Sequence, residues 1–81
     1  MPIRVAVVED DEEVRVNLAS LLERSAGFSL AAQYPDAESA LDDIVCREPD
    51  VVLMDINLPG MNGVECVKQV LALLPEVQVI M

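Results

Sequence analysis

Short apolar runs alternate with longer amphipathic stretches along the whole of this 81-residue chain. The apolar runs are typical of strands and cover residues 3–9, 28–34, 51–55 and 77–81. Between them, apolar side chains recur at helical spacing in residues 11–25, 36–47 and 62–74. Strands and helices in this alternation predict a single small α/β domain with right-handed crossovers and a mostly parallel sheet.

Each helical stretch has a capping residue in front and an apolar face. Asp10, with Glu13 three residues later, has the spacing of a capping box before the first helix. Asp36 and Asn62 precede the second and third helices in the same way. The apolar faces predicted by the spacing are Val14, Leu18, Leu21 and Leu22 in the first helix, Ala37, Ala40, Leu41, Ile44 and Val45 in the second, and Val67, Val70, Leu71 and Leu74 in the third.

The composition excludes several classes of partner. A net charge of −10 repels phosphate backbones and anionic membrane surfaces, so neither nucleic acid nor a membrane is expected to bind directly. Cys46 and Cys66 lack the spacing of a metal site and the chain has no His, so two reduced thiols are expected. No signal-peptide pattern is present and no apolar run reaches the roughly 18 residues of a membrane span, so we expect a cytoplasmic protein.

Acidic residues close two of the predicted strands. Glu9 and Asp10 end the first strand, and Asp55 ends the third, just before a turn-rich segment. Open α/β sheets bind ligands at the carboxyl ends of their strands. In the strand order 2-1-3-4 the first and third strands are neighbours about 4.8 Å apart, and these acids converge. In the order 3-2-1-4 the second strand separates them, so joint action of the acids favours the first order.

Three converging carboxylates repel one another, which raises their pKa values and favours a bound cation. Carboxylates combined with water and phosphate oxygens are the usual ligands of Mg²⁺. A carboxylate beside Mg²⁺ can also attack phosphorus and form an aspartyl phosphate. The chain has no Walker loop, so a nucleotide is not expected as the phosphodonor. These acids therefore predict a metal-assisted phosphoacceptor at Asp55.

Other interpretations of the acids are less complete. Acids in a first helical turn stabilise the helix by about 0.3–1 kcal/mol each, which accounts for residues 11–13. An EF-hand loop starting at Asp55 would need oxygen ligands where Pro59 and Cys66 stand. A haloacid-dehalogenase-like phosphatase typically has a second acid two residues after its nucleophile, where this chain has Asn57.

The pair Glu9-Asp10 after the first strand and the segment 55–63 after the third resemble the receiver (CheY-like) domain of bacterial two-component response regulators. Pro59 and Gly63 match the loop that shapes the site in that family. The loop is most similar to regulators with a LuxR/NarL-type helix-turn-helix output domain. The resemblance implies a flavodoxin-like, three-layer, doubly wound parallel sheet of order 2-1-3-4, truncated after its fourth strand.

The resemblance gives each acid a role. Asp55 matches the phosphoacceptor, Asp10 a direct Mg²⁺ ligand, and Glu9 the second acid of the pair, where many relatives have Asp. Asn57 matches the position that offers its backbone carbonyl to the metal. The implied partners are a sensor histidine kinase and an output or DNA-binding domain outside this chain. Phosphorylation of Asp55 itself is the chemistry implied, rather than enzymatic turnover.

The family pattern continues past this chain with a fifth strand, two helices, a Thr or Ser and a Lys. Met81 precedes all of these, and Lys68 in the third helix does not replace the Lys. We therefore expect weak phosphoryl switching and a fourth strand, with Val77, Val79 and Ile80, that forms an open sheet edge. The alternative function is a receiver that is not phosphorylated and associates through this strand or its helix surfaces, as a homodimer or by strand exchange.

Overall fold

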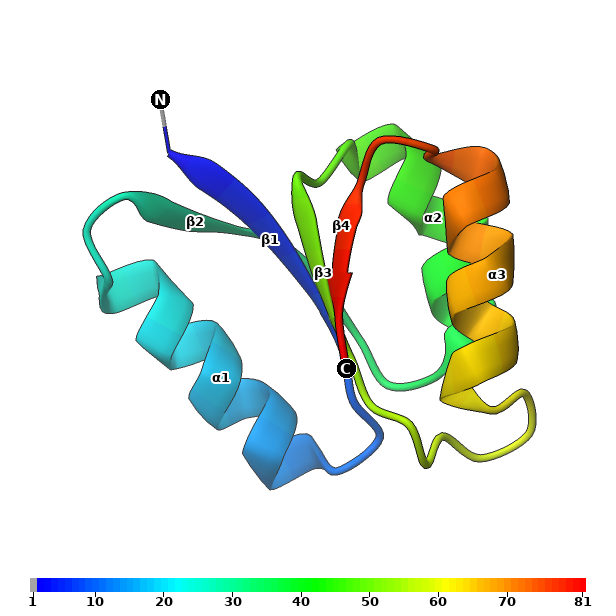
Figure 1. Cartoon of the computed structure of the whole chain (residues 1–81). Helices are drawn as coiled ribbons and strands as arrows, with labels where there is room; N and C mark the ends of the chain where they lie inside the picture. The colour runs from blue at the N-terminus through cyan, green and yellow to red at the C-terminus, as the bar shows by residue number, and fades with distance from the viewer. Residues whose placement is uncertain (1) are drawn as a thin grey trace.

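Residues 2–81, the part of the chain that this computed structural model describes, form a parallel sheet with helices on both faces (Figure 1). In chain order its elements are β1 (Ile3–Val8), α1 (Glu12–Arg24), β2 (Phe28–Tyr34), α2 (Ala37–Arg47), β3 (Val51–Met54), α3 (Gly63–Leu73) and β4 (Gln78–Ile80). The strand order is β2-β1-β3-β4, and each neighbouring pair is parallel. The α/β class and the order 2-1-3-4 are thus confirmed, and the order 3-2-1-4 is excluded.

The two faces of the sheet are covered unequally. The helices α2 and α3 lie together on one face, and α1 lies alone on the other (Figure 1). The main core fills the space between the sheet and the paired helices, and its fully buried members include Ala6, Val8, Val52, Ala37, Ala40, Ile44, Cys66 and Val70. In α1 the buried side chain is Ala19 alone. None of the helices in residues 2–81 combines the length and apolar character needed to cross a membrane.

The helices are shorter than expected because the residues at their ends are caps. Asp11, rather than Asp10, caps α1, and its side chain accepts a hydrogen bond from the Val14 N–H at 3.1 Å. Asp36 and Asn62 cap α2 and α3 as expected, but all three caps have extended backbone and lie outside their helices. The expected bounds 11–25, 36–47 and 62–74 were therefore too wide.

Three strands also end earlier than expected. Glu9 and Asp55 lie just beyond β1 and β3, which end at Val8 and Met54 rather than at residues 9 and 55. The strand β4 covers Gln78–Ile80 instead of residues 77–81, because the Val77 N–H donates to the Leu74 carbonyl in the preceding turn. Glu9 and Asp55 thus each follow a strand directly, and their N–H groups still donate to carbonyls of the neighbouring strands.

Several residues of the expected apolar faces are exposed. In α2, Ile44 is fully buried, but its neighbour Val45 is 45% exposed. In α3 the buried stripe runs through Gly63, Cys66 and Val70, and Leu71 is exposed. In α1, Val14 and Leu21 are exposed as well. A helix on a sheet buries a narrow stripe, and apolar residues beside that stripe satisfy the same spacing without being buried.

The adjacent residues Ile44 and Val45 test this orientation of α2. We expect Ile44→Ala to lower the free energy of unfolding by about 2–5 kcal/mol, because it leaves a cavity in the core. Val45→Ala, at an exposed position, should change it by about 0.5 kcal/mol or less. Urea unfolding followed by circular dichroism measures both, and equal losses in the two variants would contradict the orientation.

Candidate functional site

The predicted acids meet at the carboxyl end of β1 and β3. The Asp55 N–H donates to the Val8 carbonyl at 3.0 Å, so Asp55 follows β3 directly beside the end of β1. Carboxylate oxygens of Glu9, Asp10 and Asp55 lie within 4.8 Å of one another. Glu9 and Asp55 are half-buried, and Asp10 is exposed. The structure therefore brings together the three side chains that the sequence placed at one sheet edge.

The backbone of Glu9 is held from two sides. Its N–H donates to the carbonyl of Tyr34, at the end of β2, at 3.0 Å. Its carbonyl accepts a hydrogen bond from Nη1 of Arg15, on the first turn of α1, also at 3.0 Å. These contacts restrain the Glu9 backbone, at the start of the segment that carries two of the three acids.

The loop after β3 approaches α3 closely. The Asn57 N–H donates to Oδ1 of Asp55 at 3.1 Å, and the Gly63 N–H donates to the Ile56 carbonyl at 3.1 Å. A Cβ atom on Gly63 would overlap the Asp55 carbonyl oxygen and lie 2.8 Å from Cα of Ile56. Glycine at this position thus lets the start of α3 pack against the backbone of Asp55. Metal ligation by the Asn57 carbonyl stays a prediction.

The acids share a proton near neutral pH. Burial, together with the adjacent Asp55 carboxylate, raises the pKa of Glu9 from 4.5 to about 7, and the charges of Asp10 and Asp11 add to the effect. The pKa of Asp55 is lowered, mainly by hydrogen bonding with Glu9 and then by the Asn57 N–H. Glu9 therefore holds the proton, and Asp55 stays ionised beside it.

The donor set fits a hard divalent cation. Its atoms are carboxylate oxygens at one edge, with no nitrogen or sulfur donor in the cluster. Such oxygen ligands suit Mg²⁺ or Ca²⁺ rather than zinc. A cavity of about 260 Å³ adjoins the acids and is lined by Glu9 and Asp55 together with apolar side chains such as Val14, Leu18 and Ile80.

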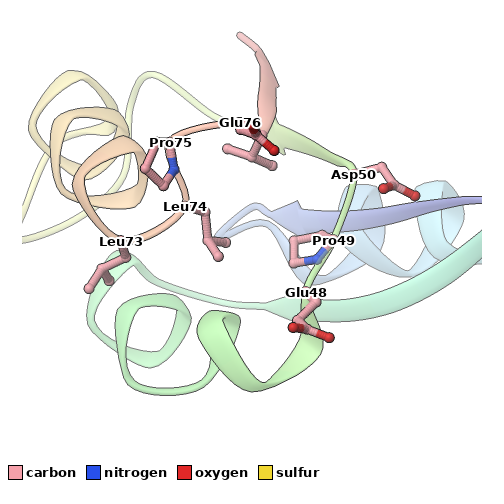
Figure 2. Close-up of a pocket in the computed structure, with 8 residues that line it drawn as sticks. Glu48, Pro49, Asp50, Leu73, Leu74, Pro75 and Glu76 are labelled. Atoms are coloured by element: carbon pink, nitrogen blue, oxygen red, sulfur yellow. The ribbon is translucent and has the colours of Figure 1, made fainter.

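A larger cavity, of about 550 Å³, lies at the opposite end of the sheet (Figure 2). It is lined by Glu48, Pro49, Asp50, Leu73, Leu74, Pro75, Glu76 and Val77. One of its acids is already engaged, since Oδ2 of Asp50 accepts the Arg4 N–H at 2.9 Å. Within residues 2–81 the acids Glu9, Asp10 and Asp55 form the one group of three that could hold a metal ion. The chemistry of the side chains, rather than cavity size, therefore marks the site.

The sequence did not identify Arg15 as part of this region. One signal was available, because a cation on the first turn of a helix is disfavoured by the helix macrodipole. Such a residue calls for a partner outside its own helix. Here that partner is the Glu9 carbonyl.

Comparison with known proteins agrees with this geometry. The sequence matches the response regulator receiver domain family over residues 5–81. The chain belongs to this family. The receiver is 38% identical over 79 residues to the transcriptional regulatory protein LnrK of Bacillus subtilis (strain 168). The aligned residues make up 98% of this chain and 36% of LnrK. It thus spans about a third of the length of that relative.

Solved structures show the same fold. The receiver superposes on the response regulator domain of Thermotoga maritima CheB with a TM-score of 0.92 and 31% identity, covering 100% of this chain and 60% of that one. A two-component response regulator of the LuxR family from Aurantimonas sp. SI85-9A1 gives a TM-score of 0.88 at 29% identity, covering 98% of this chain and 56% of that one. The resemblance to receivers, including those of LuxR-type regulators, is therefore confirmed.

We expect Gly63→Ala to displace the loop that carries Asp55. The added Cβ has no room beside Asp55 and Ile56, so the free energy of unfolding should fall by about 1–3 kcal/mol. Amide NMR resonances of Asp55 and Asn57 should shift at the same time. Val64→Ala, at the exposed next position, is the control. Unchanged stability and resonances in Gly63→Ala would disprove the close approach.

The shared proton makes the stability of the metal-free receiver depend on pH. The folded state binds the Glu9 proton more tightly than the unfolded chain, so the free energy of unfolding should fall as pH rises from about 5 to about 8. Glu9→Gln should remove this fall, and Glu12→Gln, at an exposed position on α1, should keep it. Denaturant unfolding at several pH values measures the trend, and carboxyl ¹³C NMR should give an apparent pKa near 7. A flat profile in the unmodified receiver would contradict the shared proton.

Proposed function

We propose that Asp55 accepts a phosphoryl group from a sensor histidine kinase, with Mg²⁺ held by Glu9, Asp10, Asp55 and the Asn57 carbonyl. The observation that carries this proposal is the convergence of three carboxylates within 4.8 Å at the carboxyl end of β1 and β3. Membership of the receiver family supports it, because residues 5–81 match that family. Phosphorylation of Asp55 would control an output domain, and the likeness to the transcriptional regulator LnrK favours transcription as the output.

In the proposed step an oxygen of Asp55 attacks phosphorus. The new P–O bond forms as the bond between phosphorus and the donor's imidazole nitrogen breaks, and that nitrogen keeps the electron pair. The lowered pKa of Asp55 supplies the ionised form that attack requires. Oδ1 accepts the Asn57 N–H, which leaves Oδ2 as the attacking atom. When bound, Mg²⁺ would neutralise charge on the transferring group.

Glu9 has a separate part in this proposal. With a pKa raised to about 7, it carries a proton in about half of the metal-free molecules at pH 7. Carboxylates bind metal ions in their ionised form, so Glu9 would release this proton when the metal binds. Its side chain is one methylene longer than that of Asp10, which gives it a longer reach toward the metal.

The surface charge limits the partners of this segment. A net charge of −10 disfavours nucleic acid and anionic membranes, so DNA contact would belong to a domain outside this chain. A cytoplasmic location, where a sensor kinase presents its phosphohistidine, goes with this proposal. The chemistry proposed is phosphorylation of the receiver itself, with no further substrate turned over.

Labelling with acetyl phosphate and Mg²⁺ tests the phosphoacceptor. The receiver should gain the mass of one phosphoryl group, and Asp55→Asn should gain none, because an amide cannot attack phosphorus. Asp10→Asn should weaken Mg²⁺ binding about tenfold or more, since it removes a charged ligand. Asp42→Asn, an exposed aspartate on α2, is the matched control and should label normally. Equal labelling of Asp55→Asn and the unmodified receiver would rule out Asp55.

The second candidate is association without phosphorylation. It is favoured by the position of β4 at the edge of the sheet described for residues 2–81, with Ile80 exposed on it. The same labelling experiment separates the two candidates. An unlabelled receiver that forms concentration-dependent dimers in sedimentation would support association through this edge.

A further inference from the structure

Arg15 links α1 to the acidic site. Its Nη1 donates to the Glu9 carbonyl at 3.0 Å, in a partly buried contact. Among the hydrogen bonds of residues 2–81, this is the one that joins an α1 side chain to the carboxyl edge of the sheet. The helix macrodipole disfavours a cation on this first turn.

The carbonyl that Arg15 contacts belongs to the peptide unit between Glu9 and Asp10. Because a peptide unit is planar, fixing its oxygen restrains ψ of Glu9 and φ of Asp10 together. These two angles set the direction of the Asp10 side chain relative to that of Glu9. The peptide unit follows Val8, the last residue of β1, so strand pairing does not hold it. The contact with Arg15 therefore restrains two of the three acids at once.

Arg15 approaches the acids without occupying their oxygens. Within residues 2–81 the ion pair joins Arg47 to Asp43, both on α2, and Arg15 makes no ion pair with an acid. The guanidinium thus meets a backbone carbonyl, and the carboxylate oxygens of Glu9, Asp10 and Asp55 remain available to a metal ion. An arginine that neutralised the acids directly would compete with that ion.

We propose that Arg15 is a positioning residue for the metal site and aims the carboxylates of Glu9 and Asp10 toward Asp55 through their shared peptide unit. The inference rests on the proposed function, because it concerns the Mg²⁺ that phosphorylation of Asp55 requires. It adds a residue on α1 to a site otherwise built from the ends of β1 and β3.

A positioning role and a purely electrostatic role for Arg15 predict opposite changes in Mg²⁺ affinity in Arg15→Met. Removing a nearby positive charge should by itself tighten binding of Mg²⁺, since repulsion between cations is lost. Loss of positioning should weaken it, and we expect the dissociation constant to rise about tenfold, as for other residues that orient metal ligands. The direction of the change therefore decides between the two effects.

The experiment is a titration of the metal-free receiver with Mg²⁺, in which calorimetry and amide NMR each measure the dissociation constant. Arg15→Lys should bind within about threefold of the unmodified receiver, because the ammonium can donate to the same carbonyl. Arg24→Met is the matched control at the other end of α1. It removes the same charge and should change the dissociation constant by about twofold or less, since salt screens that distance. The Asp10 amide resonance should shift in Arg15→Met before any metal is added.

Equal or tighter binding in Arg15→Met would overturn the inference, as would equal weakening by Arg15→Met and Arg24→Met. Should Arg15→Met fail to fold in circular dichroism, Arg15→Gln takes its place, because its shorter side chain cannot span the same distance and should show the same loss. Absence of saturable Mg²⁺ binding in the unmodified receiver would overturn the proposed function and this inference together. Normal binding that Arg15→Met leaves unchanged would overturn this inference alone.

Discussion

The pairing of β1 with β3 is the constraint on which the acidic site depends. Val8 lies opposite Met54 in the parallel ladder, and the Asp55 N–H continues it to the Val8 carbonyl. This register places Asp55 beside Glu9 as the two strands end. Because successive side chains point to opposite faces, a slip by one residue would also turn Val52 and Met54 out of the core. Burial of the sheet face therefore fixes the position of the acids as well.

Bringing three carboxylates to one edge has an electrostatic cost, which the metal-free receiver reduces with a shared proton. The raised pKa of Glu9 and the lowered pKa of Asp55 reflect one arrangement, in which the neutral carboxyl group of Glu9 donates a hydrogen bond to the ionised carboxylate of Asp55. The Asn57 N–H adds a donor to Asp55, and Gly63 lets α3 start close behind it. A divalent cation would take over the role of the proton.

The sequence predicts the elements and the acids, because apolar runs and strand ends are local features. Hydrophobic periodicity alone allows two strand orders, and the convergence of Glu9, Asp10 and Asp55 together with the receiver resemblance selected the order 2-1-3-4, which the structure confirms. The cap of α1 was misplaced because a run of acids offers several candidates, and the choice depends on β1 ending at Val8. The contact between Arg15 and the Glu9 carbonyl could not be predicted, because it needs the relative position of a helix and a strand end.

Because the two faces of the sheet are covered unequally, the helices that follow the acids differ in how much apolar surface they bury. Asp55 follows β3 and leads into α3, on the side where Ile44, Cys66 and Val70 fill a closed core. Glu9 and Asp10 lead into α1, which buries little and so has less apolar packing to resist local opening. We therefore expect the phosphoacceptor to be held firmly, while the segment with Glu9 and Asp10 adjusts more readily. A hydrogen bond from α1 to that segment matters most under these conditions, because few other contacts restrain it.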